Sequence, residues 1–179
     1  MTGKEIRLGR LFSKGENAVV VAMDHGEFEG PLPGMIELPE VVKGLAPEVS
    51  ALLLSPGMLA HCGHAFASKG APLAMVRLNW STVYCPDWGH NHGDTVQAVS
   101  ASDAVAAGAD LVLISLTLNT GSEARDASNV EVFCRLAGEA RRLGVPVVGE
   151  YFPLRSNKLR GEEIHDEVYR GCRIAAELG

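Results

Sequence analysis

Short runs of consecutive apolar residues alternate along the chain with longer stretches in which apolar residues recur at helical spacing. The apolar runs lie at residues 18–23, 50–54, 72–79, 110–116 and 145–151. An apolar run of this length, rich in valine, isoleucine and leucine, predicts a strand that is buried on both faces, as in a parallel sheet. The pattern therefore predicts five parallel strands.

The stretches between and after these runs predict helices. We expect them near residues 37–47, 56–68, 95–107, 122–143 and 160–178. The clearest is the fourth, in which Val130, Phe133 and Leu136 recur at three-residue spacing along one face. Strict alternation of strand and helix predicts right-handed crossovers between parallel strands.

The number of repeating units sets the expected architecture. The expected strands begin about 32 residues apart, and a (β/α)8 barrel needs about 250 residues, whereas this chain has 179. We expect an α/β fold in which residues 1–179 form a single domain, an incomplete (β/α)8 TIM barrel with about five βα units. The alternative is an open five-stranded α/β domain. An incomplete barrel has two unpaired strand edges, so we expect further units after Gly179 or a homo-oligomer.

Composition and charge narrow the class of partner. A net charge of −6 and a pI near 5.5 argue against nucleic acid or an anionic membrane. No apolar run approaches the roughly 18 residues of a membrane span, and the charged N-terminus lacks a signal-peptide core. We expect a cytoplasmic protein with no membrane partner. No cofactor is expected, because the chain has no glycine-rich dinucleotide fingerprint and no phosphate P-loop.

Polar side chains end several of the expected strands, and barrels place their active sites at that edge. The candidates are Asp24 and His25 after the first run, Arg77 and Asn79 at the end of the third, and Glu150 and Tyr151 at the end of the fifth. We expect Asp24 and Tyr151 to be catalytic and the other four to bind substrate. Carboxylates, a phenol and a cation at one mouth favour proton-transfer chemistry on a small polar substrate.

Some of these residues have two interpretations. Arg77 alternates with Met75 and so points into the interior, where an arginine needs a carboxylate or an anionic ligand. We interpret it first as a partner of Asp24 or Glu150 and second as a substrate contact. Asp24 is correspondingly either a structural partner of Arg77 or a proton-transfer group. Glu150 and Tyr151 are adjacent, so on a strand they face opposite sides and at most one points into the barrel.

Two histidine-containing segments, residues 61–64 and 85–92, raise the alternative of a metal site. Neither spacing matches a structural zinc motif, so we expect no metal. The second segment follows the third strand on the active side and is the better candidate of the two. The alternative function is a metal-dependent barrel hydrolase or lyase that uses Asp24, His25, His90 and His92.

Lysine bears on the type of catalysis. The chain has five lysines, Lys4, Lys14, Lys43, Lys69 and Lys158, and none ends an expected strand. A Schiff-base lysine needs a desolvated or electropositive pocket that keeps its amine neutral. Lys158 follows the fifth strand on the active side, but in a polar stretch. Residues 1–179 alone are therefore expected to be incompetent in Schiff-base chemistry.

Six segments together resemble a known family. In order they read LGRLF, VVVAMDHG, MVRLNWST, AVAAGADLVLISLTLNTGSE, VVGEYFP and RIAAELG. They resemble the class I aldolases of the archaeal fructose-bisphosphate aldolase type, a group that includes bacterial phosphosugar aldolase and thiolase relatives. The resemblance implies a Schiff-base carbon–carbon lyase of carbohydrate metabolism, including glycolysis, acting on a phosphorylated ketose or keto substrate. A non-catalytic phosphosugar-binding barrel without the lysine is a further alternative.

The resemblance also implies residue roles. Asp24 takes the place of the strand-one aspartate, Arg77 that of a lysine in an LKLNG-like segment, and Tyr151 that of the catalytic tyrosine in a WxYPRG-like segment of strand five. The Schiff-base lysine is expected a few residues after Gly179. The YPRG segment reads YFPL from Tyr151 onward, and such departures leave the exact substrate open.

Overall fold

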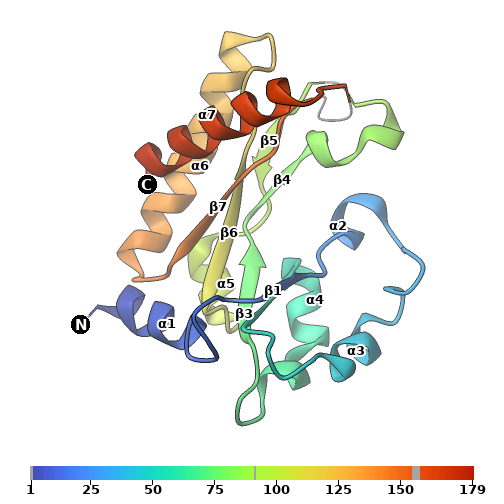
Figure 1. The fold of residues 1–179 in the computed structure, drawn as a ribbon, viewed down its shortest axis with the longest axis vertical. Helices are drawn as coiled ribbons and strands as arrows, with labels where there is room; N and C mark the ends of the chain where they lie inside the picture. The colour runs from blue at the N-terminus through green and yellow to red at the C-terminus, as the bar shows by residue number, and fades with distance from the viewer. Residues whose placement is uncertain (1, 91, 155–157) are drawn as a thin grey trace.

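The computed structural model describes residues 2–90, 92–154 and 158–179 (Figure 1). The helices and strands are α1 (Gly3–Leu11), β1 (Val20–Ala22), α2 (Gly26–Glu29), α3 (Leu38–Val41), η1 (Val42–Gly44), β2 (Ala51–Leu54), α4 (Pro56–His61), η2 (Gly63–Phe66), β3 (Leu73–Arg77), β4 (Asn79–Ser81), η3 (Thr82–Tyr84), η4 (Pro86–Trp88), β5 (Thr95–Gln97), α5 (Ala101–Ala106), β6 (Leu111–Leu116), α6 (Glu123–Arg142), β7 (Val147–Tyr151) and α7 (Glu162–Leu178), where η marks a 3-10 helix.

The main sheet has five strands in the order β1-β2-β3-β6-β7, and every neighbouring pair is parallel. Helices connect the strands and cover the outer face of the sheet, with α6 and α7 beside β6 and β7 (Figure 1). The predicted α/β fold of five βα units is confirmed as a parallel half-barrel. No helix in the described part of the chain is long and apolar enough to cross a membrane.

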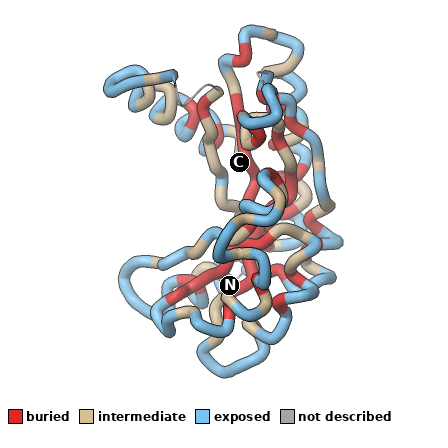
Figure 2. Tube along the Cα trace, turned by 90° about the vertical axis from the view of Figure 1, so that its right-hand side faces the viewer, coloured by how far each residue is buried: buried red, intermediate tan, exposed pale blue. Residues whose placement is uncertain are grey.

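Two separate apolar cores lie on the two faces of this sheet. On the outer face, alternate strand residues such as Leu52, Val76 and Ile114 pack with Phe133 and Leu136 of α6. Figure 2 shows buried stretches of the chain running through the middle of the molecule. The period of two in each strand makes this division, because successive side chains point to opposite faces. The predicted apolar face of α6 is therefore the face that covers the sheet.

The inner core lies on the concave side and is closed at one end by α1. It contains the intervening strand residues, including Leu53, Met75 and Leu113, together with Leu11 of α1. A capping box, in which the Thr2 side chain accepts from the N–H of Glu5 and the Glu5 side chain accepts from that of Thr2, starts α1. This helix is not among those predicted from the sequence, although its capping signal is visible at its start.

The third predicted strand is shorter than expected, and a hairpin takes the place of its end. The predicted strand 72–79 stops at Arg77, and β4 then pairs antiparallel with β5. Leu78 makes the switch, because its N–H still donates to the main sheet while its carbonyl accepts from Ala98 and Val99 in the hairpin. The prediction of a helix over 95–107 is therefore wrong at its start.

Three of the predicted helices are shorter than expected. Ser100 caps α5, so helix begins only at Ala101. The helices predicted at 37–47 and 56–68 are each a short α-helix followed by a 3-10 turn, α3 with η1 and α4 with η2. The helices predicted at 122–143 and 160–178 are confirmed as α6 and α7.

The prediction that the first strand is buried on both faces is wrong. Val20 is 43% exposed, whereas every residue of β2, β3 and β6 is buried. The reason is position, because β1 is an edge strand with β2 as its one partner among the described residues. β7 forms the other edge and is partly exposed too.

Helix α7 approaches β7 closely enough to require a glycine. A Cβ atom at Gly171 would lie only 2.2 Å from ring atoms of Tyr151. A contact this short forces the tyrosine or the helix to move. Gly138 of α6 is a contrasting position, since a Cβ there would meet nothing closer than Arg142 Nη1 at 3.7 Å.

The two glycines should respond to alanine with opposite signs. Gly171→Ala should destabilise the fold by about 1–3 kcal/mol through overpacking, in spite of the better helix propensity of alanine. Gly138→Ala should stabilise it by up to about 1 kcal/mol. Urea unfolding of both variants checks this. Equal effects at the two positions would contradict the close packing of α7 on Tyr151.

Candidate functional site

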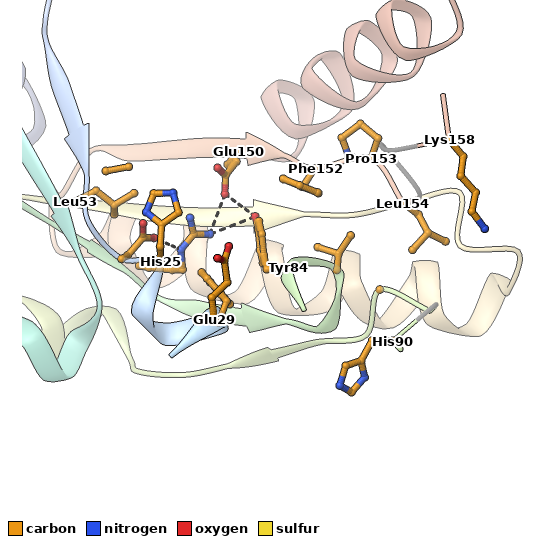
Figure 3. A pocket seen from close by; sticks show the side chains of 16 residues that line it. His25, Glu29, Leu53, Tyr84, His90, Glu150, Phe152, Pro153, Leu154 and Lys158 are labelled. Carbon is orange, nitrogen blue, oxygen red and sulfur yellow. Dashed lines mark hydrogen bonds and ion pairs between the residues drawn. The ribbon is translucent and has the colours of Figure 1, made fainter. Parts of the chain in front are cut away.

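A buried cluster of charges lies where the carboxyl ends of β1, β3 and β7 meet. Arg77 Nε donates to Asp24 Oδ2 at 2.5 Å, and Arg77 Nη1 donates to Glu150 Oε2 at 2.8 Å (Figure 3). The side chains of Arg77 and Asp24 are each 4% exposed, and that of Glu150 is 33% exposed. The interpretation of Arg77 as a partner of Asp24 or Glu150 is confirmed, and it pairs with both.

Tyr84 completes this cluster. Its hydroxyl donates to Glu150 Oε2 at 2.5 Å and accepts from Arg77 Nη1 at 3.3 Å. Its ring packs against Phe28 and Phe152, with centroid distances of 4.4 and 4.7 Å. The guanidinium carbon of Arg77 lies 4.9 Å from the centroid of Tyr84 and 5.1 Å from that of Phe28, which adds cation–π attraction.

The loop that carries Tyr84 is closed by its own hydrogen bonds. Ser81 Oγ accepts from the N–H of Val83 and turns the chain into η3. Thr82 and Asp94 then bond across the loop, since the N–H of Thr82 donates to the Asp94 carbonyl and the N–H of Asp94 donates to Thr82 Oγ1. The loop is expected on the active side, but Tyr84 is not among the predicted site residues, because the tyrosine lies beyond the strand end.

Burial and charge set the protonation of the cluster. Burial alone would lower the pKa of Arg77, but its electrostatic interactions with Tyr84, Glu150 and Asp24 outweigh that effect and raise the pKa above the ordinary arginine range. Burial, followed by the negative charge of Glu150, raises the pKa of Tyr84 well above its ordinary value. Arg77 is therefore a permanent cation and Tyr84 a proton donor at neutral pH.

The cluster forms one wall of a cavity of about 470 Å³ (Figure 3). The lining residues are Ala22, Asp24, His25, Phe28, Glu29, Leu53, Arg77, Val83, Tyr84, His90, Gly93, Glu150, Phe152, Pro153, Leu154 and Lys158. Four of the six predicted site residues, Asp24, His25, Arg77 and Glu150, thus lie together. His90 and Lys158 lie toward the opposite end of the cavity from His25 in Figure 3.

Asn79 and Tyr151 lie outside that lining. The Asn79 side chain is fully buried and bonds Ser115 three times, through its backbone N–H, carbonyl and hydroxyl. It joins β4 to β6. Tyr151 packs with the outer core, and its hydroxyl donates to Glu167 Oε1 of α7 at 2.6 Å. Its pKa is raised by burial and by this bond.

The alternation predicted for the end of β7 is confirmed. Glu150 faces the cavity, and Tyr151 faces the helices. The next residue, Phe152, lines the cavity again.

In a WxYPRG-like segment the tyrosine immediately precedes the proline, and here Phe152 immediately precedes Pro153. A register set by the proline therefore puts Phe152, which has no hydroxyl, at the tyrosine position. The catalytic role of Tyr151 stays a prediction, and this placement does not support it.

Glu27 is a buried carboxyl beside this cluster. Its Oε2 atom has no hydrogen-bond partner within the described structure. Burial raises its pKa from the ordinary 4.5 to about 7, with Arg77 opposing and Asp24 adding to the shift. Its backbone carbonyl accepts from Trp80 Nε1 at 3.2 Å, which ties α2 to β4.

The histidines do not gather around a common centre. Among the residues that the structure describes, no group of three or more His, Cys, Asp or Glu side chains could hold a metal ion. His64 Nε2 lies 2.9 Å from the carbonyl oxygen of Pro39, which links η2 to α3. His90 lines the cavity, whereas His92 is exposed outside it.

Comparisons with known proteins agree on one family. A model of the DeoC/LacD family aldolases matches residues 18–179. An uncharacterized aldolase of Saccharolobus solfataricus is 34% identical over 100% of this chain and 66% of its own length. The 2-amino-3,7-dideoxy-D-threo-hept-6-ulosonate synthase of Halobacterium salinarum is 31% identical over 99% of this chain and 62% of its own length. The chain thus spans less than two thirds of these two relatives.

A solved structure has the same fold. It is an archaeal fructose-1,6-bisphosphate aldolase with its catalytic lysine covalently bound to the carbinolamine intermediate of the substrate. The TM-score is 0.75 at 24% identity, and the match covers 99% of this chain and 67% of that one. The half-barrel described above is therefore the arrangement found in an aldolase barrel.

Arg77 should be the residue on which the cluster depends most. Arg77→Met leaves the buried Asp24 carboxylate without its cation, and it should cost about 3–5 kcal/mol of stability. Arg77→Lys should cost less, although one ammonium cannot reproduce both contacts of the guanidinium. Urea unfolding measures both. A loss below about 1 kcal/mol for Arg77→Met would mean that the pair behaves as an exposed one.

Glu27 should make stability depend on pH. Its folded pKa of about 7 lies above the ordinary 4.5, so the folded state binds this proton more tightly. Its contribution is complete below about pH 4.5 and is lost as pH rises through 7. Glu27→Gln has no ionisable group at this position and so escapes this loss of stability. The free energy of unfolding of the variant, relative to that of the wild type, should therefore increase between about pH 5 and pH 8. Unfolding at both pH values tests this, and a difference that is independent of pH would contradict it.

Proposed function

This chain belongs to the DeoC/LacD family of aldolases, and on that premise we propose that the protein is a class I, Schiff-base carbon–carbon lyase acting on a small phosphorylated ketose, such as fructose 1,6-bisphosphate. The observation that carries the proposal is the buried Asp24–Arg77–Glu150 cluster at the barrel mouth. Fixed carboxylates and a cation around a cavity can orient sugar hydroxyls and move protons between them.

The charges of the lining support a division of the cavity. Arg77 is already matched by two carboxylates, so we assign it to holding the site rather than to binding phosphate. We assign the phosphate end of the substrate to the side of Lys158, an exposed cation of the lining. The polyol end then lies at Asp24 and His25, where carboxylate and imidazole can accept or donate hydrogen bonds to hydroxyls.

The proposed bond chemistry follows that of the matched aldolase. A lysine amine adds to the ketose carbonyl to form a carbinolamine, and the carbinolamine loses water to give an iminium. The iminium accepts the electron pair of the breaking carbon–carbon bond. We assign to Asp24 the proton transfers at the carbinolamine hydroxyl. The cytoplasmic location, the homo-oligomeric state and the part in glycolysis stay predictions.

Borohydride trapping tests this function directly. Incubation of the full-length protein with fructose 1,6-bisphosphate or a related ketose phosphate, followed by sodium borohydride, should leave a reduced adduct on one lysine, visible by mass spectrometry. The adduct should persist in Lys158→Arg, because Lys158 is exposed and so lacks the desolvation that a Schiff-base lysine needs.

Two controls interpret the result. Borohydride alone and unphosphorylated fructose with borohydride should give no adduct at the same concentration. If none of the ketose phosphates gives an adduct with the full-length protein, the Schiff-base mechanism is wrong. Loss of the adduct in Lys158→Arg would instead identify Lys158 as the nucleophile.

A further inference from the structure

We propose that Tyr84 is the acid–base hydroxyl of this site and that Glu150 takes and returns its proton during bond cleavage. The inference rests on the proposed aldolase function and concerns which tyrosine performs it. It moves the role from strand five, where the family pattern places it, to the loop after strand three. The evidence is the position of three side chains around one cavity.

The first support is the position of the hydroxyl. Tyr84 lines the cavity, and its Oη is 2.5 Å from Glu150 Oε2. Figure 3 shows dashed lines from this oxygen to the labelled Glu150 carboxylate and to a guanidinium nitrogen, which is Nη1 of Arg77. Phe28 and Phe152 pack on the tyrosine ring, and the closed loop fixes its backbone. The hydroxyl of Tyr84 is thus positioned by its hydrogen bonds, by the packing of its ring and by its loop. Proton transfer requires such a fixed geometry.

The second support is that the strand-five tyrosine faces the wrong way. Tyr151 is bonded to Glu167, and its ring lies against the backbone of α7 at Gly171. A rotation of its side chain into the cavity is prevented, because the strand pleat directs it outward. Phe152 reaches the cavity from the same strand, but it has no proton to give.

The third support is the pairing of donor and acceptor. Tyr84 stays protonated, because burial and Glu150 raise its pKa. A protonated phenol can act as a base only if it passes its own proton onward. Glu150 is placed to receive that proton through the same short hydrogen bond, and Arg77 holds the carboxylate oxygen that accepts it.

The proton steps balance within this pair. In cleavage, the substrate hydroxyl gives its proton to Tyr84 Oη as Tyr84 gives its own to Glu150. The O–H electron pair forms the carbonyl of the departing aldehyde. The carbon–carbon bond breaks, and its pair moves into the iminium to give an enamine. Glu150 then returns the proton through Tyr84 to the enamine carbon. No external acid, base or oxidant is needed.

The three tyrosines of the chain provide a matched test. Tyr84→Phe keeps the aromatic stack and removes only the hydroxyl. With the ketose phosphate that forms an adduct in the borohydride experiment as substrate, kcat for cleavage should fall by about 10²- to 10⁴-fold. KM should change little, since the loss lies in the chemical step. Tyr169 is 71% exposed on α7, so Tyr169→Phe is the surface control and should leave kcat unchanged. Tyr151→Phe tests the competing assignment.

A second readout separates this inference from the function on which it rests. Tyr84→Phe should still form the borohydride adduct, because the lysine step precedes the proton relay. It should lose the exchange of a carbon-bound hydrogen of dihydroxyacetone phosphate with D2O, which reports protonation of the enamine. Glu150→Gln should lose the same exchange, because an amide cannot accept the proton.

Each outcome decides one point. Wild-type kcat and exchange in Tyr84→Phe, with the adduct intact, would overturn the role of Tyr84 and leave the aldolase function standing. A large loss of kcat in Tyr151→Phe alone would also overturn it and return the role to strand five. Absence of any adduct in the wild type would overturn both proposals. Unfolding curves for each variant exclude a loss of fold as the cause.

Discussion

The burial of one guanidinium constrains the whole mouth of this half-barrel. A cation removed from water costs several kcal/mol unless carboxylates compensate it closely. Arg77 meets that requirement with Asp24 from the end of β1 and Glu150 from β7. Strands far apart in sequence must therefore end within ion-pair distance of one another. The site and the alignment of the strand ends are in this sense one feature of the molecule.

The concave face changes character along its length for the same reason. At one end α1 seals apolar layers that include Leu53 and Met75. Further along the strands, Arg77 follows Met75 on the inward face of β3 and Glu150 follows Val148 on the inward face of β7, and both line the cavity. The apolar layers supply the low-dielectric floor that strengthens the ion pairs above them. The apolar inner core and the proposed site thus lie at the two ends of the same strands.

Under the proposed assignment, this division lets the protein combine the fold of the aldolase family with a different set of proton-transfer groups. Glu150 lies on the inward face of β7 next to an outward tyrosine, and Tyr84 reaches the same place from a neighbouring loop. Family membership and fold are independent of that assignment, since they depend on the strand pattern. The assignment of roles depends on which side chains the pleat and the loop deliver to the cavity.

The local pattern of residues was enough to determine the parallel strands, the long helices α6 and α7, and the convergence of Asp24, Arg77 and Glu150. Apolar runs and helical spacing are properties of neighbouring residues, and the fold rule for strand ends supplies the rest. It could also limit Glu150 and Tyr151 to opposite faces, but it could not say which of them points inward. Only the tertiary structure decided that choice, the exposure of Val20 on an edge strand, and the entry of Tyr84 into the site. These depend on register, on strand order and on the path of a loop, which are set by contacts between residues distant in the chain.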